Sequence, residues 1–217
     1  MTQTARKLRI LAFGDSLTQG ETYNSTTYLP YTTRLRELME KNGFGCFDLD
    51  NAGITGEFVR DELINRLPGI LEKQGPYDLV VILGGTNDLS THKTGDEEAL
   101  YKGIVQLHEL SLKHGAKTLL LTMPESDFFY KDLAATGTSY VKEEGEKGRV
   151  TVNEMLREFA RKCEGVYLCD IEKAIPQRSL NEEKLDLYWD DGLHFTPEGY
   201  NKMAEVIFDT IKQVNWD

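Results

Sequence analysis

The chain has 217 residues, of which 40% are hydrophobic and 28% charged, and 36 acidic residues outnumber 25 basic ones to give a net charge of −11. This length and composition are ordinary for a soluble globular protein with a sizeable core, and we expect one domain over residues 1–217. The negative charge argues against nucleic acid and anionic membranes as partners, because nucleic-acid binding depends on clustered Lys and Arg. No apolar run has the length that a membrane-spanning helix needs.

The N-terminal residues Met1 to Lys7 are polar, and the apolar run after them is about six residues long, which is shorter than the core of a signal peptide. We therefore expect a cytoplasmic protein, while an extracellular mature form that has lost a leader stays open. The three cysteines, Cys46, Cys163 and Cys169, are odd in number and have no metal-ligand spacing. They are typical of buried free thiols in a reducing compartment.

Short apolar runs alternate along the chain with segments of helical periodicity. The runs are continuous rather than alternating, which is typical of parallel strands buried on both faces. We expect strands at Leu8–Phe13, Gly45–Asn51, Tyr77–Leu83, Lys117–Thr122 and Val166–Cys169. We expect helices at Pro30–Asn42, Glu57–Glu72, Asp96–His114, Arg149–Cys163 and Thr196–Val214, the second of them broken at Pro68 and the last capped by Thr196 with Pro197 in its first turn. This order predicts a three-layer α/β/α sandwich around a five-stranded parallel sheet.

Two long stretches, 124–148 and 170–190, have no clear periodicity. Loops of that length often form lids, substrate walls or binding loops, and we expect these to be irregular. The charge run Glu143–Lys147 within the first of them is interpreted as a solvated loop.

Chemistry-bearing residues follow the first three predicted strands. Ser16 comes just after the first strand, Gly53 and Gly56 after the second, and Asn87 after the third. Ligands of such folds bind outside the carboxyl ends of the strands. The three loops are therefore expected to meet at one edge of the sheet.

A serine hydroxyl at this edge needs a base before it can act as a nucleophile at neutral pH. His194 is the best candidate, and a carboxylate must then orient its imidazole and stabilise the charged form. Asp191 lies three residues earlier, close enough for a turn to bring its carboxylate to the ring. Asp190 is a rival that spacing alone leaves open.

Two further segments offer donors for a developing oxyanion. Residues 51–56, Asn-Ala-Gly-Ile-Thr-Gly, form a loop whose bare backbone can approach a ligand closely. Residues 84–88, Gly-Gly-Thr-Asn-Asp, follow a strongly apolar strand, and the Asn87 amide can stabilise negative charge without titrating.

Four segments in this order, 14–17 (Gly-Asp-Ser-Leu), 51–56, 84–88 and 191–194 (Asp-Gly-Leu-His), resemble the GDSL or SGNH-hydrolase family of esterases and lipases. Together they span nearly the whole chain. The resemblance implies a flavodoxin-like sheet, ester hydrolysis, and no metal or organic cofactor. The chain has no Gly-x-Ser-x-Gly elbow, which disfavours the ordinary α/β-hydrolase fold.

The resemblance also implies roles for individual residues. Ser16 would be the nucleophile, with Asp191 and His194 completing a catalytic triad. The oxyanion hole would be formed by the backbone N–H of Ser16, the backbone N–H of Gly56 and the side chain of Asn87. The spacing in the family favours Asp191 over its neighbour Asp190.

Other polar residues are interpreted as structural. Asp15 and Asp88 are expected to bond to nearby backbone. His108 falls on an apolar helix face and is expected to be packed and hydrogen-bonded, and His114 suits a helix C-terminus. His92 lies in a polar loop and is a weaker candidate for the rim of the site.

The predicted function is hydrolysis of short-chain carboxylic esters of small molecules through an acyl-enzyme. Carbohydrate deacetylation is the alternative among hydrolases, and a non-catalytic binding member of the fold is the alternative outside them. Aromatic residues in loops could shape a substrate pocket or simply pack: Tyr23, Tyr28, Phe128, Phe129, Tyr130 and Trp189. The oligomeric state is left open.

Overall fold

The computed structural model describes residues 7–22, 26–91, 95–126 and 139–216, with the side chains of the last range from residue 144 onward. Its centre is a five-stranded parallel sheet in the order β4-β1-β5-β6-β7. This is the flavodoxin-like order, in which the second strand of the sheet lies outside the first. The predicted fold class is confirmed, and the strands are β1 Leu8–Gly14, β4 Phe47–Gly53, β5 Leu79–Leu83, β6 Lys117–Leu121 and β7 Val166–Cys169.

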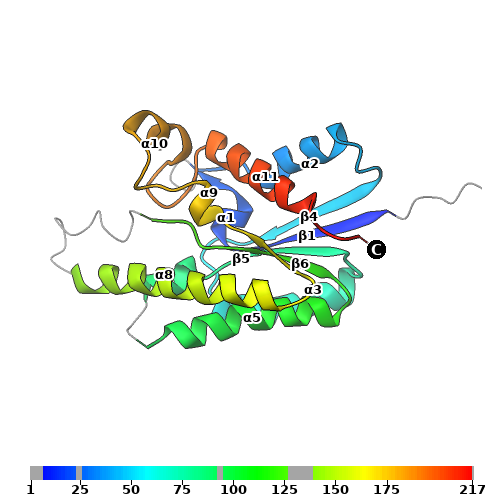
Figure 1. Ribbon diagram of the computed structural model, residues 1–217, viewed down its shortest axis with the longest axis horizontal. Helices are drawn as coiled ribbons and strands as arrows, with labels where there is room; N and C mark the ends of the chain where they lie inside the picture. The colour runs from blue at the N-terminus through cyan, green and yellow to red at the C-terminus, as the bar shows by residue number, and fades with distance from the viewer. Residues whose placement is uncertain (1–6, 23–25, 92–94, 127–138, 217) are drawn as a thin grey trace, which may run out of the picture.

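Helices cover both faces of the sheet (Figure 1). One face carries α2 Tyr31–Lys41 and α11 Pro197–Ile211, and the other carries α3 Ile64–Gln74, α5 Glu97–Lys113 and α8 Ser139–Lys162. Short elements lie in the connections: α1 Ser16–Gln19, α4 Thr86–Ser90, α9 Ile171–Ala174, α10 Glu182–Tyr188, and the antiparallel pair β2 Glu21–Thr22 and β3 Thr27–Tyr28.

The continuous apolar runs are explained by burial on both sides of the sheet. In β1, Ile10 and Ala12 belong to the core beneath α2 and α11, while Leu11 and Phe13 belong to the core beneath α3, α5 and α8. All four side chains are fully buried. Because neighbouring residues of a strand point to opposite faces, a strand covered on both sides must be apolar at every position.

The start of the last helix follows its sequence signal. The Thr196 hydroxyl accepts a hydrogen bond from the Gly199 N–H at 3.1 Å, and Pro197 is the first helical residue. This cap satisfies one of the donors that a helix N-terminus leaves unpaired. The predicted cap is confirmed, and it places His194 just before a well-anchored helix.

The predicted break at Pro68 is wrong, because α3 continues through this residue. The change in geometry comes one turn earlier, where a π-helical turn, Val59–Leu63, runs directly into α3. The N–H that proline lacks would have reached the carbonyl of Ile64, the first residue of α3. The hydrogen bond that Pro68 cannot donate is therefore missing only at the junction between the π-helical turn and α3.

The stretch 124–148 is not irregular throughout, since α8 begins at Ser139, ten residues before the predicted start at Arg149. The charge run Glu143–Lys147 is part of this helix rather than a solvated loop. Glu146 is buried and accepts two hydrogen bonds from the Arg149 guanidinium, at 2.6 and 2.7 Å. Arg178 donates to it as well, at 2.7 Å. Because buried charged side chains take the place of apolar ones here, the part of α8 before Arg149 lacks the apolar stripe that would have marked it.

The second stretch, 170–190, is not irregular throughout either, since it contains α9 and α10. Both are shorter than a recognisable helical pattern. The cysteine prediction holds only in part. All three thiols are free, but Cys46 is exposed, Cys163 is half-buried, and only Cys169 is buried.

His108 is packed and hydrogen-bonded as predicted. It is fully buried on α5, its Nδ1 lies 2.9 Å from the Thr118 hydroxyl of β6, and its ring is tilted against Phe159. Burial lowers the pKa of His108 from 6.5 to about 3, because the charged form loses its hydration. The unfolded chain therefore binds a proton that the folded protein does not accept between these pH values.

Stability should consequently fall as the pH drops below 6.5. Between pH 7 and 5 this histidine alone should remove about 2 kcal/mol of unfolding free energy. His108→Asn keeps a polar partner for Thr118 and cannot titrate. The unfolding free energy is measured with urea at pH 7 and at pH 5 for both proteins. Its fall between the two pH values should be about 2 kcal/mol smaller in the variant than in the wild type. An equal difference in both proteins would contradict the assignment.

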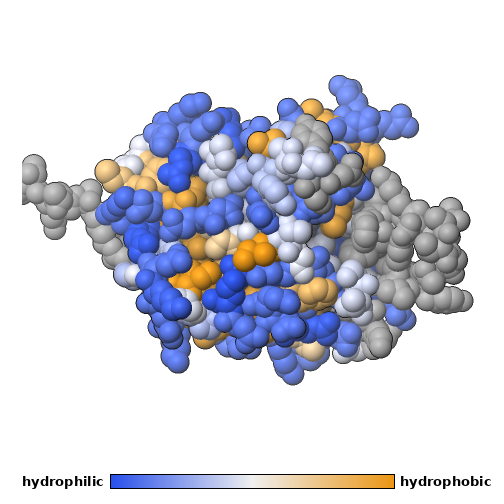
Figure 2. Space-filling model, turned by 180° about the vertical axis from the view of Figure 1, so that it is seen from behind, coloured by the Kyte–Doolittle hydropathy of each residue, from blue (hydrophilic) through white to orange (hydrophobic). Residues whose placement is uncertain are grey.

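The surface seen in Figure 2 is mostly hydrophilic, with smaller hydrophobic areas interrupted by polar residues. This agrees with the strongly acidic composition. Across the described ranges, none of the helices combines the length and the apolar character needed to cross a membrane.

Candidate active site

The loops after β1, β4 and β5 leave the sheet at the same level. Gly14, the last residue of β1, is paired with Gly53 on one side and with Leu83 on the other. A Cβ atom on Gly14 would lie 2.1 Å from the Leu83 carbonyl oxygen and 2.5 Å from the Thr18 hydroxyl. Only glycine fits there, and the chain can then turn at once into α1, whose first residue is Ser16.

A continuous hydrogen-bonded chain joins three residues that the sequence analysis had singled out. The Ser16 Oγ lies 3.0 Å from His194 Nε2, and His194 Nδ1 lies 2.8 Å from Asp191 Oδ2. Ser16 and His194 are 6% and 8% exposed, so the pair is largely withdrawn from water. This geometry allows a proton to pass from the serine to the imidazole while the carboxylate holds the ring.

The two candidate carboxylates have different surroundings. Asp191 folds back over its own loop, where Oδ1 accepts hydrogen bonds from the backbone N–H groups of Leu193 and His194 at 2.8 and 2.7 Å. The Asp190 carboxylate instead lies 3.5 Å from the Thr22 hydroxyl, and its backbone N–H donates to the His194 carbonyl. The structure therefore brings Asp191, and not Asp190, to the imidazole Nδ1.

The pKa values of this pair move in opposite directions. Burial alone would raise the pKa of Asp191, but hydrogen bonds from the His194 side chain and from two backbone N–H groups hold it far below its usual range. Burial alone would lower the pKa of His194, but the Asp191 carboxylate, with smaller contributions from Glu21 and Asp15, raises it. Asp191 therefore stays ionised, and the imidazolium form of His194 is stabilised.

The loop after β4 carries Gly56, whose backbone N–H is a predicted oxyanion donor. Gly56 has a φ of +82°, a conformation that other residues rarely adopt, and its neighbour Glu57 is held by Asn87. The Asn87 Nδ2 donates to the Glu57 carbonyl at 2.9 Å. An amide nitrogen carries two hydrogens, so one of them is left for a ligand. This bond links the two loops that carry the predicted oxyanion donors.

The two acidic residues interpreted as structural are confirmed in that role. Asp15 caps α1 by accepting the Leu17 N–H at 3.1 Å, and burial raises its pKa to about 7. Asp88 is fully buried and braces the π-helical turn by accepting the Val59 N–H at 2.8 Å and the Arg60 Nε at 3.0 Å.

Two residues at the site were missed by sequence reasoning. The Arg66 guanidinium lies 4.5 Å from the centre of the Phe13 ring, bonds to Glu57 and donates to the Ala52 carbonyl at 2.9 Å. Glu21 is a buried carboxylate whose Oε1 lies 4.0 Å from His194 Nε2. Neither belongs to a recognisable motif, and Arg66 reads in sequence as an ordinary polar position of a helix.

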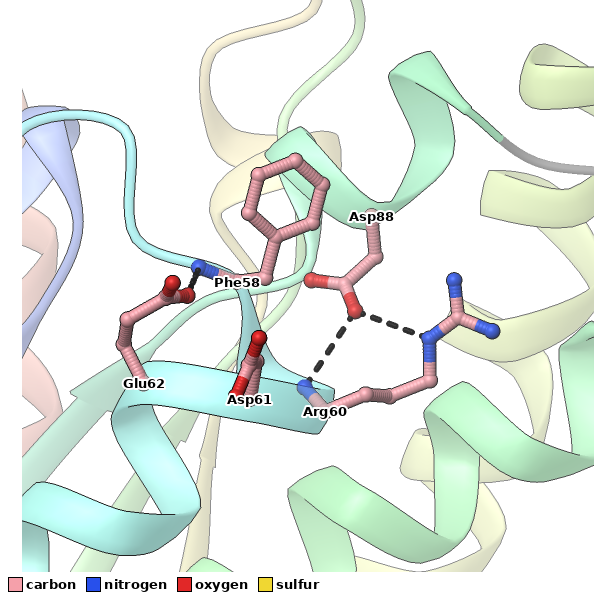
Figure 3. A pocket seen from close by; sticks show the side chains of 5 residues that line it. All are labelled: Phe58, Arg60, Asp61, Glu62 and Asp88. Atoms are coloured by element: carbon pink, nitrogen blue, oxygen red, sulfur yellow. Dashed lines mark hydrogen bonds and ion pairs between the residues drawn. The ribbon is translucent and has the colours of Figure 1, made fainter.

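A hollow of about 640 Å³ is lined by residues that adjoin two of the predicted oxyanion residues in sequence (Figure 3). Its lining begins two residues beyond Gly56 and includes Asp88, the neighbour of Asn87, but neither Ser16 nor His194. The lining is Phe58, Arg60, Asp61, Glu62 and Asp88. An aromatic ring among charged groups suits a polar ligand better than a long alkyl chain.

Of the aromatic residues that could either shape a substrate pocket or simply pack, the structure describes Trp189 and Tyr28. Trp189 is buried, with its ring 4.4 Å from that of Phe195, so it packs rather than lines an opening. Tyr28 is 47% exposed. The remaining candidates lie outside the described residues: His92, Tyr23, Phe128, Phe129 and Tyr130.

A flavodoxin-like sheet with a hydrogen-bonded Ser–His–Asp chain at its carboxyl edge defines an α/β protein of the SGNH-hydrolase fold. The model of the GDSL-like Lipase/Acylhydrolase family matches residues 12–202, and the chain belongs to this family. Membership supports the hydrolysis of small-molecule esters in general terms. No curated protein matches the chain.

Solved structures share the fold at low sequence identity. A GDSL-like lipase from Bacteroides thetaiotaomicron is 20% identical, with a TM-score of 0.68 over 94% of this chain and 88% of its own. A carbohydrate acetylesterase family member from Sinorhizobium meliloti is 17% identical, with a TM-score of 0.73 over 95% and 98%. A lipase/acylhydrolase from Enterococcus faecalis is 23% identical, with a TM-score of 0.66 over 95% and 96%.

Proposed function

We propose that this protein is a serine esterase that hydrolyses short-chain carboxylic esters through an acyl-enzyme. The observation that carries the proposal is the chain of hydrogen bonds from Ser16 Oγ through His194 to Asp191, at 3.0 and 2.8 Å. A non-catalytic member of the fold would have no need to keep this geometry in a buried site.

In the first half of the reaction, Ser16 Oγ attacks the ester carbonyl carbon while its proton passes to His194 Nε2. The negative charge that develops on the carbonyl oxygen is stabilised by the N–H groups of Ser16 and Gly56 and by the Asn87 amide. The imidazolium then gives its proton to the departing alcohol, and the acyl group stays bonded to Ser16. Asp191 holds the imidazole in the tautomer that has its free lone pair on Nε2.

In the second half, water attacks the acyl-enzyme and loses a proton to His194 Nε2. The tetrahedral intermediate collapses, the carboxylic acid leaves, and the proton returns to Ser16. Each step uses only side chains and N–H groups of this chain, so both half-reactions share one base and one set of oxyanion donors.

The test is hydrolysis of a series of p-nitrophenyl esters, from acetate and butyrate to longer acyl chains, by the wild type and by Ser16→Ala. We expect the wild type to be much faster than Ser16→Ala, with acetate or butyrate preferred over the longer acyl chains. If the wild type is no faster than Ser16→Ala on any ester of the series, the proposed function is wrong.

Asn87→Ala should lower kcat by about 10²–10³, because it removes one preorganised donor from the developing oxyanion. The KM should change little, since the charge appears only after the substrate has bound. Steady-state kinetics on p-nitrophenyl acetate separate the two effects. An unchanged kcat would remove Asn87 from the oxyanion hole.

The hollow lined by Phe58, Asp61 and Glu62 favours a second candidate, deacetylation of carbohydrates. Phe58 offers a ring face for a sugar, and the Asp61 and Glu62 carboxylates can accept hydrogen bonds from hydroxyl groups. Phe58→Ala should then raise the KM for acetylated xylo-oligosaccharides while leaving p-nitrophenyl acetate unaffected. Equal effects on both substrates would leave short-chain esterase activity as the better description.

A further inference from the structure

Glu21 lies deep in the site and has no part in the reaction described above. It begins β2, just after Gly20 has ended α1 with a φ of +86°. Its side chain is only 3% exposed, and its Oε1 lies 4.0 Å from His194 Nε2. This is the nitrogen that faces Ser16, on the opposite side of the ring from Asp191.

The other oxygen of the same carboxylate is bonded to the loop after β4. Glu21 Oε2 lies 2.5 Å from the Thr55 hydroxyl, whose single hydrogen is shared with Gln19 Oε1 at 2.8 Å, and the Thr55 N–H donates to the same Gln19 oxygen at 2.6 Å. Thr55 immediately precedes Gly56. The Glu21 backbone is fixed as well, because its carbonyl accepts the Tyr200 hydroxyl at 2.7 Å. The Glu21 carboxylate therefore lies between His194, the proposed general base, and the loop that carries the predicted oxyanion donor Gly56.

We propose that Glu21 is a positioning residue of the ester-hydrolysing site, which stabilises the imidazolium form of His194 from the Nε2 side and holds the Gly56 loop in place. This inference rests on the proposed serine esterase function. The imidazolium forms each time His194 accepts a proton, so a second buried carboxylate favours both proton transfers.

The acidic groups that surround His194 come from several elements. Asp191 bonds to Nδ1, Glu21 faces Nε2, and Asp15 acts from the turn before α1. Asp190 is directed to Thr22, and the Tyr200 hydroxyl is bonded to the Glu21 carbonyl. Within the part of the chain that the structure describes, the Asp191 and Glu21 carboxylates face the ring nitrogens, so removal of either charge should change the titration of His194.

The direction in which Glu21→Gln should shift the pH profile follows from the role of His194 as a base. The free enzyme must hold His194 neutral, so kcat/KM rises with pH through the pKa of this residue. Glu21→Gln removes a negative charge and should lower that pKa. Because Glu21 Oε1 lies 4.0 Å from His194 Nε2, the acidic limb of the kcat/KM profile should move to lower pH by about 1 unit or more. Because the imidazolium is then less stable, kcat on the plateau should fall about tenfold.

Thr55→Val separates the two roles of Glu21. It breaks the contact with the loop but leaves the carboxylate beside His194, so kcat should fall with no shift of the acidic limb. Glu21→Gln keeps an acceptor for the Thr55 hydroxyl and removes only the charge. Glu21→Asp draws the carboxylate back by one methylene, and it should give a smaller shift in the same direction as Glu21→Gln.

The experiment measures kcat/KM for p-nitrophenyl acetate from pH 4.5 to 9 in these variants, with Ser16→Ala as the background. The inference predicts a shifted acidic limb in Glu21→Gln and an unshifted one in Thr55→Val. An active Glu21→Gln with the wild-type limb would overturn it, as would equal losses in both variants without any shift. If Glu21→Gln does not fold, the position of the acidic limb in Glu21→Asp tests the proposal in the same way. Inactivity of the wild type relative to Ser16→Ala would instead refute the proposed function.

Discussion

Ser16→Ala should lower kcat/KM for p-nitrophenyl acetate by about 10⁴–10⁶, leaving only the rate that binding and the oxyanion donors provide. The Ser16 hydroxyl is the atom that lies 3.0 Å from His194 Nε2, and without it no acyl-enzyme can form. The fold should be unaffected, because alanine fits the same helical position and the Ser16 N–H remains. Thermal unfolding by circular dichroism checks that the loss is chemical.

The matched control is Ser111→Ala. This serine is also buried, but it lies on α5, where its hydroxyl donates to the Leu107 carbonyl of its own helix at 2.9 Å. Its removal should leave kcat/KM within about twofold of the wild type, because such back-bonds contribute little to a helix. Similar losses in the two variants would mean that activity depends on packing rather than on the Ser16 hydroxyl.

Asp191→Asn should lower kcat by about 10⁴, since the amide can no longer hold His194 in the tautomer that accepts the serine proton. The backbone contacts explain why the shape of the site should survive. Oδ1 accepts the N–H groups of Leu193 and His194, and an asparagine oxygen can take the same bonds. The measurement is kcat for p-nitrophenyl acetate on the plateau of the wild-type pH profile.

Asp190→Asn is the natural comparison, because it makes the same replacement of a carboxylate by an amide at the neighbouring residue. Its side chain contacts Thr22 and does not reach the imidazole Nδ1, so kcat should stay within a few-fold of the wild type. The reverse ranking of the two variants would show that the wrong carboxylate has been assigned.

The central sheet could be predicted because burial on both faces leaves a direct trace in the sequence. Every position of β5, Leu79–Leu83, is apolar and buried. The N-terminal part of α8 left no such trace. There the buried side chains include Arg149, paired with Glu146 and Glu172, so the core-facing positions look like a solvated segment. Tertiary charge pairing cannot be deduced from local periodicity.

The proposed reacting groups could be singled out from the sequence for a different reason. Ser16 and His194 sit in short segments whose residue types are dictated by chemistry and by tight turns, as the lack of room at Gly14 illustrates. Glu21 and Arg66 act through contacts with residues that are distant in sequence, Thr55 and Ala52 among them. Their types are common in any polar segment, and only the folded chain shows what they touch.

Covalent labelling can show whether Ser16 is the nucleophile of an esterase. A fluorophosphonate reacts with an activated serine and stays bonded to its oxygen, so mass spectrometry of peptides from the labelled protein identifies the residue. We expect one modified serine, Ser16, with labelling lost in Ser16→Ala and strongly slowed in Asp191→Asn. A wild type that remains unlabelled, or a label on another serine, would contradict it.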